Sequence, residues 1–393
     1  MTEKQYNAKR LFLMSCVALV VTAMTFAIRA QLENVWGEQF DLTATQMAIA
    51  IGTAFWGFTL AQFIGGPIVD LIGMKRFVRI AFFLHAIGII VTIMANGFWT
   101  LFIGTLFIGI GNGSIEAGCN PLVATIFPDA KTKMLNRFHV WFPGGIFIGG
   151  LTSYFIMDIL NLDWPFLVGT LVIPLIIYGV LMFGQKFPKT ERVEMGISYG
   201  DMWKSILKPV FLIMLFAMLL SAATELTTGQ RITSLLTDTG TSAILVLAFI
   251  NGIMALGRGF AGPIVKRLKT TGMLMFSAIV SMIGLLMLSY LTGAVLTYVS
   301  AAVFAIGICF FWPTMLGFVS EKIPESGALG LSIFGGAGML SNVLFMYISG
   351  KFTDAGATGH EILRYTAVLP AVLIIIFAFV FTYQRRLEKK AAA

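Results

Sequence analysis

The sequence contains twelve runs of mostly apolar residues, and short breaks of charged, glycine or proline residues separate each run from the next. A helix of roughly 20 apolar residues is long enough to cross the hydrocarbon core of a bilayer. The runs lack the alternation of apolar and polar residues found in membrane barrels, so only helices can satisfy the backbone in lipid. We therefore expect helices over 9–34, 44–71, 77–96, 98–126, 134–158, 164–185, 208–236, 241–265, 271–291, 294–320, 327–350 and 362–386.

The composition excludes the common soluble classes. Of the 393 residues, 58% are apolar and 12% are charged, whereas soluble domains have about 45–50% and about 25%. A soluble enzyme, a disordered chain and a nucleic-acid-binding module are therefore excluded. The cysteines Cys16, Cys119 and Cys309 have no spacing of a disulfide framework or a metal site. No catalytic triad or nucleotide loop is visible either, so we expect no enzyme, cofactor or metal.

Basic residues are distributed unevenly among the breaks. Of the 27 Lys and Arg, 22 lie in the termini or in breaks on the same side as the termini. Two lie on the other side, Lys351 and Arg364, and three lie within runs, Arg29, Arg231 and Arg258. Loops rich in Lys and Arg remain in the cytoplasm. We therefore expect an even number of spans, both termini in the cytoplasm, and a cell membrane such as the inner membrane of a bacterium.

A short repeat relates the two halves of the sequence. Gly-Pro-Ile-Val occurs at 66–69 and again at 262–265, an offset of 196 residues. Each copy closes an apolar run, and at the same offset Pro128 corresponds to Pro324. Six spans repeated in parallel give two bundles, and transporters built in this way bind substrate between them. We expect an N-terminal six-helix bundle over 1–185, a cytoplasmic linker over 186–207 and a C-terminal six-helix bundle over 208–393.

The segment Gly66-Pro-Ile-Val-Asp70-Leu-Ile-Gly73-Met-Lys75-Arg76 resembles the cytoplasmic signature of the major facilitator superfamily. It follows the second predicted span, as it does in that family, although Lys266 replaces the aspartate in the second half. The resemblance covers the whole chain in length, span count and repeat. It implies an all-α polytopic membrane protein with twelve transmembrane helices in two six-helix bundles, which transports a solute by alternating access.

Four stretches are similar to a narrower group, the fucose:proton symporter family. They are Glu116-Ala-Gly-Cys-Asn120-Pro121, Leu135-Asn136-Arg-Phe-His139, Phe311-Trp312-Pro313-Thr314 and Gly327-Ala-Leu-Gly330. In that family the glutamate of span 4 contributes to sugar binding and proton coupling, a role that the resemblance implies for Glu116. The family also has an aspartate in span 1, where alignment on Phe40-Asp-Leu-Thr43 places Ala30, next to Arg29.

Ionisable residues inside spans are costly and usually face a partner or a cavity. Arg29 lies late in the first span, Glu116 in the fourth and Glu225 in the seventh. Arg29 and Glu225 are equivalent positions of the repeat, so this pair of opposite charge would face a shared cavity. Two interpretations stay open: the groups contact the substrate, or Arg29 forms a fixed salt bridge with Glu116 or Glu225.

Amides and aromatic rings within the spans could complete a binding site. Amides bind hydroxyls but also link helices, and aromatic faces pack against the CH faces of a sugar. Trp312 is the repeat equivalent of Glu116 and could face it across the cavity. The full set expected to contact the solute is Arg29, Glu116, Asn120, Glu225, Trp312, Asn112, Trp141, Asn342 and Asn251. For proton coupling we expect Glu116 and His139, against the alternatives of a fixed ion pair and a structural hydrogen bond.

Charged residues at the predicted inner ends of spans 2 and 3 could form a gate. Asp70, Lys75 and Arg76 can bridge to the other half when the inside is closed. Arg258 is predicted near the inner end of span 8, where it would join the gate by pairing with Asp70, or else extend to the membrane surface.

These features together predict a secondary transporter that moves a small polar solute, a sugar or amino sugar, with protons as a monomer in the bilayer. A carrier of organic anions or sugar acids stays open, with Arg29 and Arg231 holding a carboxylate. A facilitator without coupling also stays open, if Arg29 permanently neutralises Glu116. An embedded enzyme would need a nucleophile and base or a metal cluster, and a sensor would need a soluble output domain.

Overall fold

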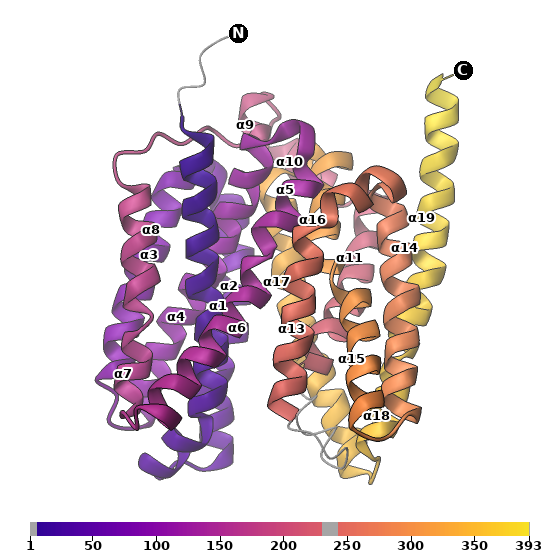
Figure 1. Cartoon of the computed structure of the whole chain (residues 1–393). Coiled ribbons are helices and arrows are strands. Elements are labelled where there is room, and N and C mark those ends of the chain that lie inside the picture. Colours follow the sequence, from indigo (N-terminus) through magenta and orange to yellow (C-terminus); the bar gives the residue numbers. More distant parts are fainter. Residues whose placement is uncertain (1–5, 230–242, 393) are drawn as a thin grey trace.

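The computed structural model describes residues 6–229 and 243–392, and every regular element within these ranges is a helix. Figure 1 shows two groups of helices side by side, one from each half of the chain. We call α1 to α8 the N-terminal half and α11 to α19 the C-terminal half. The first helix begins and the last helix ends at the same end of the molecule (Figure 1).

The N-terminal half begins with four long helices and ends with broken ones. Its elements are α1 (Ala8–Gln39), α2 (Ala44–Ile72), α3 (Met74–Ile93), α4 (Phe98–Ile126), η1 (Pro128–Ala130), α5 (Lys131–His139), α6 (Trp141–Ser153), η2 (Tyr154–Ile159), α7 (Trp164–Gly169) and α8 (Val172–Met182). The turn between α2 and α3 is a single residue, Gly73, with a φ of +84° that glycine adopts without strain. A capping box between Thr43 and Gln46 fixes the start of α2.

The linker between the halves contains two short helices, α9 (Glu191–Glu194) and α10 (Tyr199–Ser205). The C-terminal half then consists of α11 (Pro209–Ala222), η3 (Ala223–Thr227), α13 (Ala243–Gly259), α14 (Ala261–Tyr290), α15 (Ala294–Ile308), α16 (Phe311–Lys322), η4 (Pro324–Ser326), α17 (Gly327–Asp354), α18 (Gly359–Thr366) and α19 (Val368–Ala392).

Eleven helical stretches in the described residues are long and apolar enough to cross a membrane, and α13 contains a shorter apolar stretch, Val246–Gly259. The predicted all-α polytopic fold is therefore confirmed. The exposed residues Ile80, Phe83, Ile87 and Ile90 form a stripe along α3 at helical spacing. A stripe of this kind is costly in water and suits contact with lipid.

The predicted break between the eighth and ninth helices, over 266–270, is present at Lys269, whose backbone is not helical. A further interruption lies within the predicted eighth helix, where α13 ends at Gly259 and α14 begins at Ala261. The early start of α14 is possible because the first N–H groups of a helix have no helical acceptor, so Pro263 in the first turn loses no hydrogen bond.

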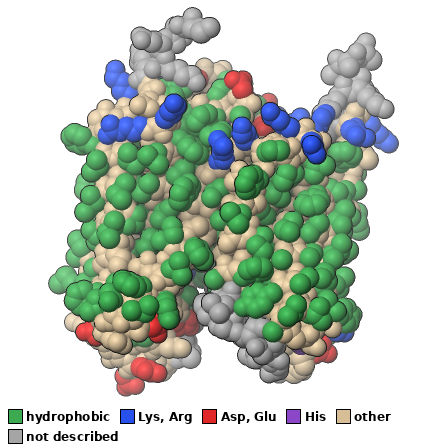
Figure 2. Space-filling model, viewed as in Figure 1, with side chains coloured by type: hydrophobic (Ala, Val, Ile, Leu, Met, Phe, Trp, Pro, Cys, Tyr) green, Lys and Arg blue, Asp and Glu red, His purple; other side chains and the backbone are tan. Residues whose placement is uncertain are grey.

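Exposed basic residues gather at the end of the molecule that carries the termini (Figure 2). We call this end the basic face; it includes Arg76, Arg79, Lys186, Lys189, Lys266, Arg267, Lys322, Arg385 and Arg386. At the opposite end, Figure 2 shows the surface hollowed between the two halves.

The two halves pack closely on the side of the basic face. Gly66 of α2 lies against α17, where an added Cβ would come within 2.8 Å of the Cβ of Ser332. Further from the basic face, the hydroxyl of Thr59 donates to the carbonyl of Gly336 at 3.3 Å. Small residues at such positions let two helices approach closely in a membrane. The chain is therefore closed at the basic face and divided at the opposite face.

Candidate functional site

Arg258, 1% exposed, lies at the centre of a polar cluster between the halves. Its Nη2 donates to Oε1 of Glu225 at 2.8 Å, and its Nε donates to the carbonyl of Cys309 at 2.7 Å. Its Nη1 donates across the boundary to the carbonyl of His139, at 3.1 Å. One guanidinium thus joins three elements of the C-terminal half to the N-terminal half, in the fork geometry that arginine provides.

Two prolines explain why these carbonyls are free to accept. A helical carbonyl normally accepts from the N–H four residues later, and proline has no N–H. Pro143 follows His139 by four residues, and Pro313 follows Cys309 by four. Helix α5 accordingly ends at His139 and α15 ends just before Cys309. The sequence therefore leaves one carbonyl in each half without a helical partner, and Arg258 bonds both.

The N-terminal side of the cluster is a chain of three polar side chains from α4 and α5. The amide of Asn120 donates to Oε2 of Glu116 at 3.4 Å, and the amide oxygen of Asn120 lies 3.0 Å from Nε2 of His139. All three residues are buried. Glu116, Asn120 and His139 are therefore neighbours in one buried chain of hydrogen bonds.

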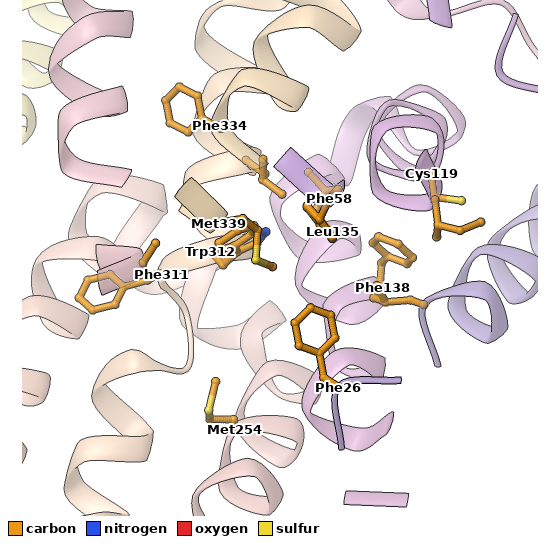
Figure 3. Packing of buried hydrophobic residues seen from close by; sticks show 14 of the residues in the cluster. Phe26, Phe58, Cys119, Leu135, Phe138, Met254, Phe311, Trp312, Phe334 and Met339 are labelled. Carbon is orange, nitrogen blue, oxygen red and sulfur yellow. The ribbon is translucent and has the colours of Figure 1, made fainter. Parts of the chain in front are cut away.

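Trp312 of α16 completes the cluster from the other half. It lies beside Glu116, in agreement with their equivalence in the repeat. Figure 3 shows its ring directed toward Leu135 and Phe58 of the N-terminal half. The ring fits because the neighbouring α17 has Gly338, where an added Cβ would overlap it.

Several buried polar atoms around this cluster make no hydrogen bond within the described residues. They are Oε2 of Glu225, Nε1 of Trp312, Nδ2 of Asn342 and both amide atoms of Gln62. A buried group left unpaired costs about 1–3 kcal/mol. Carboxylate, indole and amide groups together offer the donors and acceptors that bind the hydroxyls of a polar solute.

Arg29 makes no hydrogen bond or ion pair with the cluster in the described structure, so the salt bridge considered for it with Glu116 or Glu225 is absent there. Glu225 pairs with Arg258 instead. The guanidinium of Arg29 lies over the rings of Phe26 and Phe55, at 4.7 Å and 5.3 Å from their centroids.

Three amide or indole residues of the expected site lie elsewhere or have other partners. Asn112 bonds Nε2 of His85 and the hydroxyl of Thr25 within the N-terminal half, at 2.9 Å each. Asn251 donates to its own helix, at Leu247. Trp141 is 40% exposed, because it begins α6 on a surface that other helices leave uncovered. A sequence pattern gives residue type and depth, but not which face of the helix a side chain occupies.

The predicted gate residues differ in their partners. The side chain of Asp70 is fully buried and accepts from Nε of Arg192 at 2.6 Å and from the hydroxyl of Thr190. Arg258 does not pair with Asp70, because Glu225 and two freed carbonyls hold it deeper in the protein. Lys75 and Arg76 make no ion pair with the described part of the other half, and Arg76 is exposed.

The linker supplies partners that sequence reasoning missed. Glu191 of α9 binds Lys131 at 2.7 Å, and Lys131 also donates to the carbonyl of Ser320 in the other half. The hydroxyl of Thr132 donates to Glu321 at 2.6 Å. The many charged residues of 186–194 are the sequence feature that could have indicated these partners. Arg231, expected as a second carboxylate ligand, lies outside the described residues.

A family model described as "Major Facilitator Superfamily" matches residues 11–346. Among curated proteins, the galactose transporter of Saccharomyces cerevisiae is 32% identical over 106 residues, which are 26% of this chain and 18% of that protein. The hexuronate transporter of Bacillus subtilis is 28% identical over 159 residues, 40% of this chain and 36% of that protein. The matched stretch spans about a quarter of the length of the first curated relatives.

Two solved structures share the fold across almost the whole chain. The outward conformation of FucP has a TM-score of 0.78 at 16% identity and covers 94% of this chain and 98% of its own. The proton:xylose symporter XylE, bound to 6-bromo-6-deoxy-D-glucose, has a TM-score of 0.77 at 14% identity and covers 94% of each chain. At such low identity the similarity concerns the fold alone.

Proposed function

The chain belongs to the Major Facilitator Superfamily, and we propose that it is a secondary active transporter that moves a sugar-like solute together with protons. The two halves change their relative orientation, so that the site between them opens to one side of the membrane and then to the other. The closed basic face and the hollow opposite face correspond to one of these two states (Figure 2).

One observation carries the proposal: the buried polar cluster lies on the boundary between the halves and is built from both. Glu116, Asn120 and His139 come from the N-terminal half, and Glu225, Arg258 and Trp312 from the C-terminal half. Polar groups at this depth in a membrane protein usually mark a substrate or ion pathway. The unpaired atoms around the cluster provide a reason for a polar solute to bind there.

The names of the similar proteins support a sugar-like solute and proton coupling. The curated relatives include facilitated glucose, galactose, xylose and hexuronate transporters, and the structural neighbours include two proton symporters. Among the buried carboxyl groups of the described residues, Glu116 is the one best placed to bind a proton, because Glu225 and Asp70 are each paired with an arginine and Glu116 is not.

The basic face lies in the cytoplasm under this proposal, because loops rich in Lys and Arg are retained there. The exposed hydrophobic sides of the molecule then contact lipid, and the hollow between the halves opens away from the cytoplasm. The protein acts as a monomer in a cell membrane such as a bacterial inner membrane.

Uptake into proteoliposomes tests the proposal. Purified protein is reconstituted and given radiolabelled D-galactose, D-xylose, L-fucose and the corresponding uronic acids, with and without an inward pH gradient. We expect accumulation of at least one of these solutes above its equilibrium level only with the gradient. The variant Glu116→Gln should still exchange solute but not accumulate it, whereas Glu361→Gln, a helix-cap carboxylate, should behave as wild type. Full accumulation by Glu116→Gln would remove Glu116 from coupling, and no uptake of any solute would contradict the proposed function.

A further inference from the structure

Arg29 is a buried cation with no anion at ion-pair distance in the described residues, and the exposed Glu33, one turn later on α1, acts on it only from further away. The side chain of Arg29 is 8% exposed, and it makes no ion pair or hydrogen bond in the described part of the chain. Each of the other buried cations has a carboxylate: Arg258 has Glu225, and Arg192 has Asp70. Lys131 likewise has Glu191. Arg29 is thus the exception among these groups.

The aromatic contacts of Arg29 leave its donors free. Phe26 and Phe55 lie against its guanidinium, and such cation–π contacts contribute about 0.5–2 kcal/mol. They provide no hydrogen-bond acceptor, whereas a guanidinium has five N–H donors arranged to bind a carboxylate with two parallel bonds. A buried charge needs such a partner to offset its loss of hydration. Arg29 therefore has free N–H donors that suit a carboxylate, and no residue of the described structure supplies a carboxylate to bind them.

The neighbours of Arg29 on α1 relate its guanidinium to the site between the halves. Phe26 lies one turn before Arg29 on α1 and contacts the ring of Phe142, and Figure 3 shows it beside the residues that line the boundary. On the other side of Arg29, Glu33 and Asn34 are exposed. Polar residues exposed on a helix as central as α1 face water rather than lipid. Phe26 also contacts Phe55 of α2, and α2 and α6 are the helices that pack against α17 and α13 of the other half. The side of α1 that carries Phe26 and the Arg29 guanidinium therefore faces the boundary between the halves.

We propose that the transported solute is a sugar acid whose carboxylate binds Arg29 while its hydroxyls bind the cluster at Glu116 and Trp312. This inference rests on the proposed function and specifies the substrate of that same site. It accounts for the one buried cation that lacks a carboxylate, since the substrate provides the carboxylate.

The charges of the site then balance. Glu225 and Arg258 neutralise one another. A proton on Glu116 leaves Arg29 as the single uncompensated charge of the site, and a monoanion cancels it. One carboxylate and one proton moved together carry no net charge. Uptake of a sugar acid should therefore follow the pH gradient and not the membrane potential, whereas a neutral sugar moved with one proton would respond to both.

Paired substrates in proteoliposomes test the inference. D-galacturonate is compared with D-galactose, and D-glucuronate with D-glucose, under a pH gradient alone and under a potential set by potassium and valinomycin. The variants are Arg29→Gln, which removes the charge, and Arg29→Lys, which keeps the charge but loses the fork. Arg364→Gln is the matched control, because Arg364 also stacks on a ring, Tyr290, at 4.3 Å. Solute-dependent thermal stabilisation of each purified variant reports its folding and its binding together.

We expect uptake of a uronate and not of its neutral partner, with little response to the potential. Arg29→Gln should weaken uronate binding about 10- to 100-fold, Arg29→Lys less, and Arg364→Gln not at all. Uptake of the neutral sugar in preference to the uronate would overturn the inference and leave the proposed function intact. Unchanged uronate affinity in a folded Arg29→Gln variant would also overturn it. If none of the four sugars is taken up, both the inference and a sugar as substrate are wrong.

Discussion

The guanidinium of Arg258, in the C-terminal half, donates a 3.1 Å hydrogen bond to the backbone carbonyl of His139, in the N-terminal half. The bond crosses the boundary between the halves at a point that is closed to solvent. Because the carbonyl belongs to the backbone, no substitution of the His139 side chain removes it directly. If the halves separate at the basic face during transport, this bond must break, and Arg258 must then be held by Glu225 and Cys309 alone.

Replacing one partner of the Glu225–Arg258 ion pair should lower the stability of the protein more than replacing both partners with apolar residues. Glu225→Gln or Arg258→Gln alone leaves one buried charge without a partner and should lower the free energy of unfolding by about 3–5 kcal/mol. The double variant Glu225→Leu with Arg258→Met should regain most of that stability but not transport. Thermal unfolding in detergent and uptake in proteoliposomes measure the two effects.

The control for this experiment is the exposed ion pair of Lys208 and Glu325, at 3.3 Å. Removing either partner there should cost no more than about 1 kcal/mol, because water already solvates both charges. A double variant at Glu225 and Arg258 that transports normally would show that the pair has no part in the transport cycle.

Replacing either proline that frees a carbonyl should keep or raise the stability of the protein but lower its transport. Pro313→Ala restores an N–H that can bond the carbonyl of Cys309, so the helix becomes continuous and competes with Arg258. Alanine favours a helix interior over proline by about 3 kcal/mol, so the thermal stability should stay the same or rise while uptake falls at least about tenfold.

Pro143→Ala should act in the same way through the carbonyl of His139. Pro174→Ala is the control, because α8 packs against α1 and α3 of its own half. If uptake by Pro313→Ala equals that of the wild type, the freed carbonyl is not needed by Arg258 during transport.

The helices could be predicted from the sequence because the bilayer imposes their length and their apolar character. The repeat also located partners: Trp312 and Glu116, equivalent positions, lie beside one another. The ends of helices were less predictable where proline and glycine have two possible effects. The eighth helix was expected to be continuous to Val265, and instead it is interrupted at Phe260, with Pro263 in the first turn of α14.

The site was only partly predictable because residue type and depth do not specify a partner. Glu116, Asn120 and His139 were expected as candidates for solute binding or proton coupling, but the hydrogen bonds that join them could not be foreseen. Arg258 was expected near the inner surface, and the two carbonyls that draw it into the core depend on contacts between distant segments. His85 was missed, since a single histidine in an apolar run gives no sign of its partners.

Asn112 should behave as a structural residue and not as a ligand of the solute. Its amide bonds His85 and Thr25, and His85 also contacts the hydroxyl of Tyr178 at 3.2 Å, all within the N-terminal half. Asn112→Leu should therefore lower the free energy of unfolding by about 1–3 kcal/mol and leave the KM for solute unchanged. Asn342→Leu should instead raise the KM, because its Nδ2 has no partner in the described structure, and it should also cost some stability, because its Oδ1 accepts from the hydroxyl of Thr227 at 3.1 Å. A higher KM in Asn112→Leu at unchanged stability would place Asn112 in the binding site.

The bond between Asp70 and Arg192 should hold the basic face closed. Arg192 lies in the linker, and its side chain packs against Gly327 at the start of α17, so it connects α2 with the other half. Asp70→Asn or Arg192→Gln should shift the protein toward the state that is open at the basic face. The neighbouring Ser326 is 1% exposed and reports this opening when replaced by cysteine, since the native cysteines are buried.

We expect a maleimide reagent to label Ser326→Cys about tenfold faster in either single variant than in the unaltered background, which corresponds to about 1.4 kcal/mol of lost closure. The exchange of charges, Asp70→Arg with Arg192→Asp, should restore part of the protection, because the pair can form again with reversed sign. Asp201→Asn is the control, because Asp201 forms an exposed ion pair with Lys204 at 3.5 Å. It should leave the labelling rate of Ser326→Cys unchanged. Equal labelling in all variants would mean that close packing of α2 against α17, and not this ion pair, keeps the basic face closed.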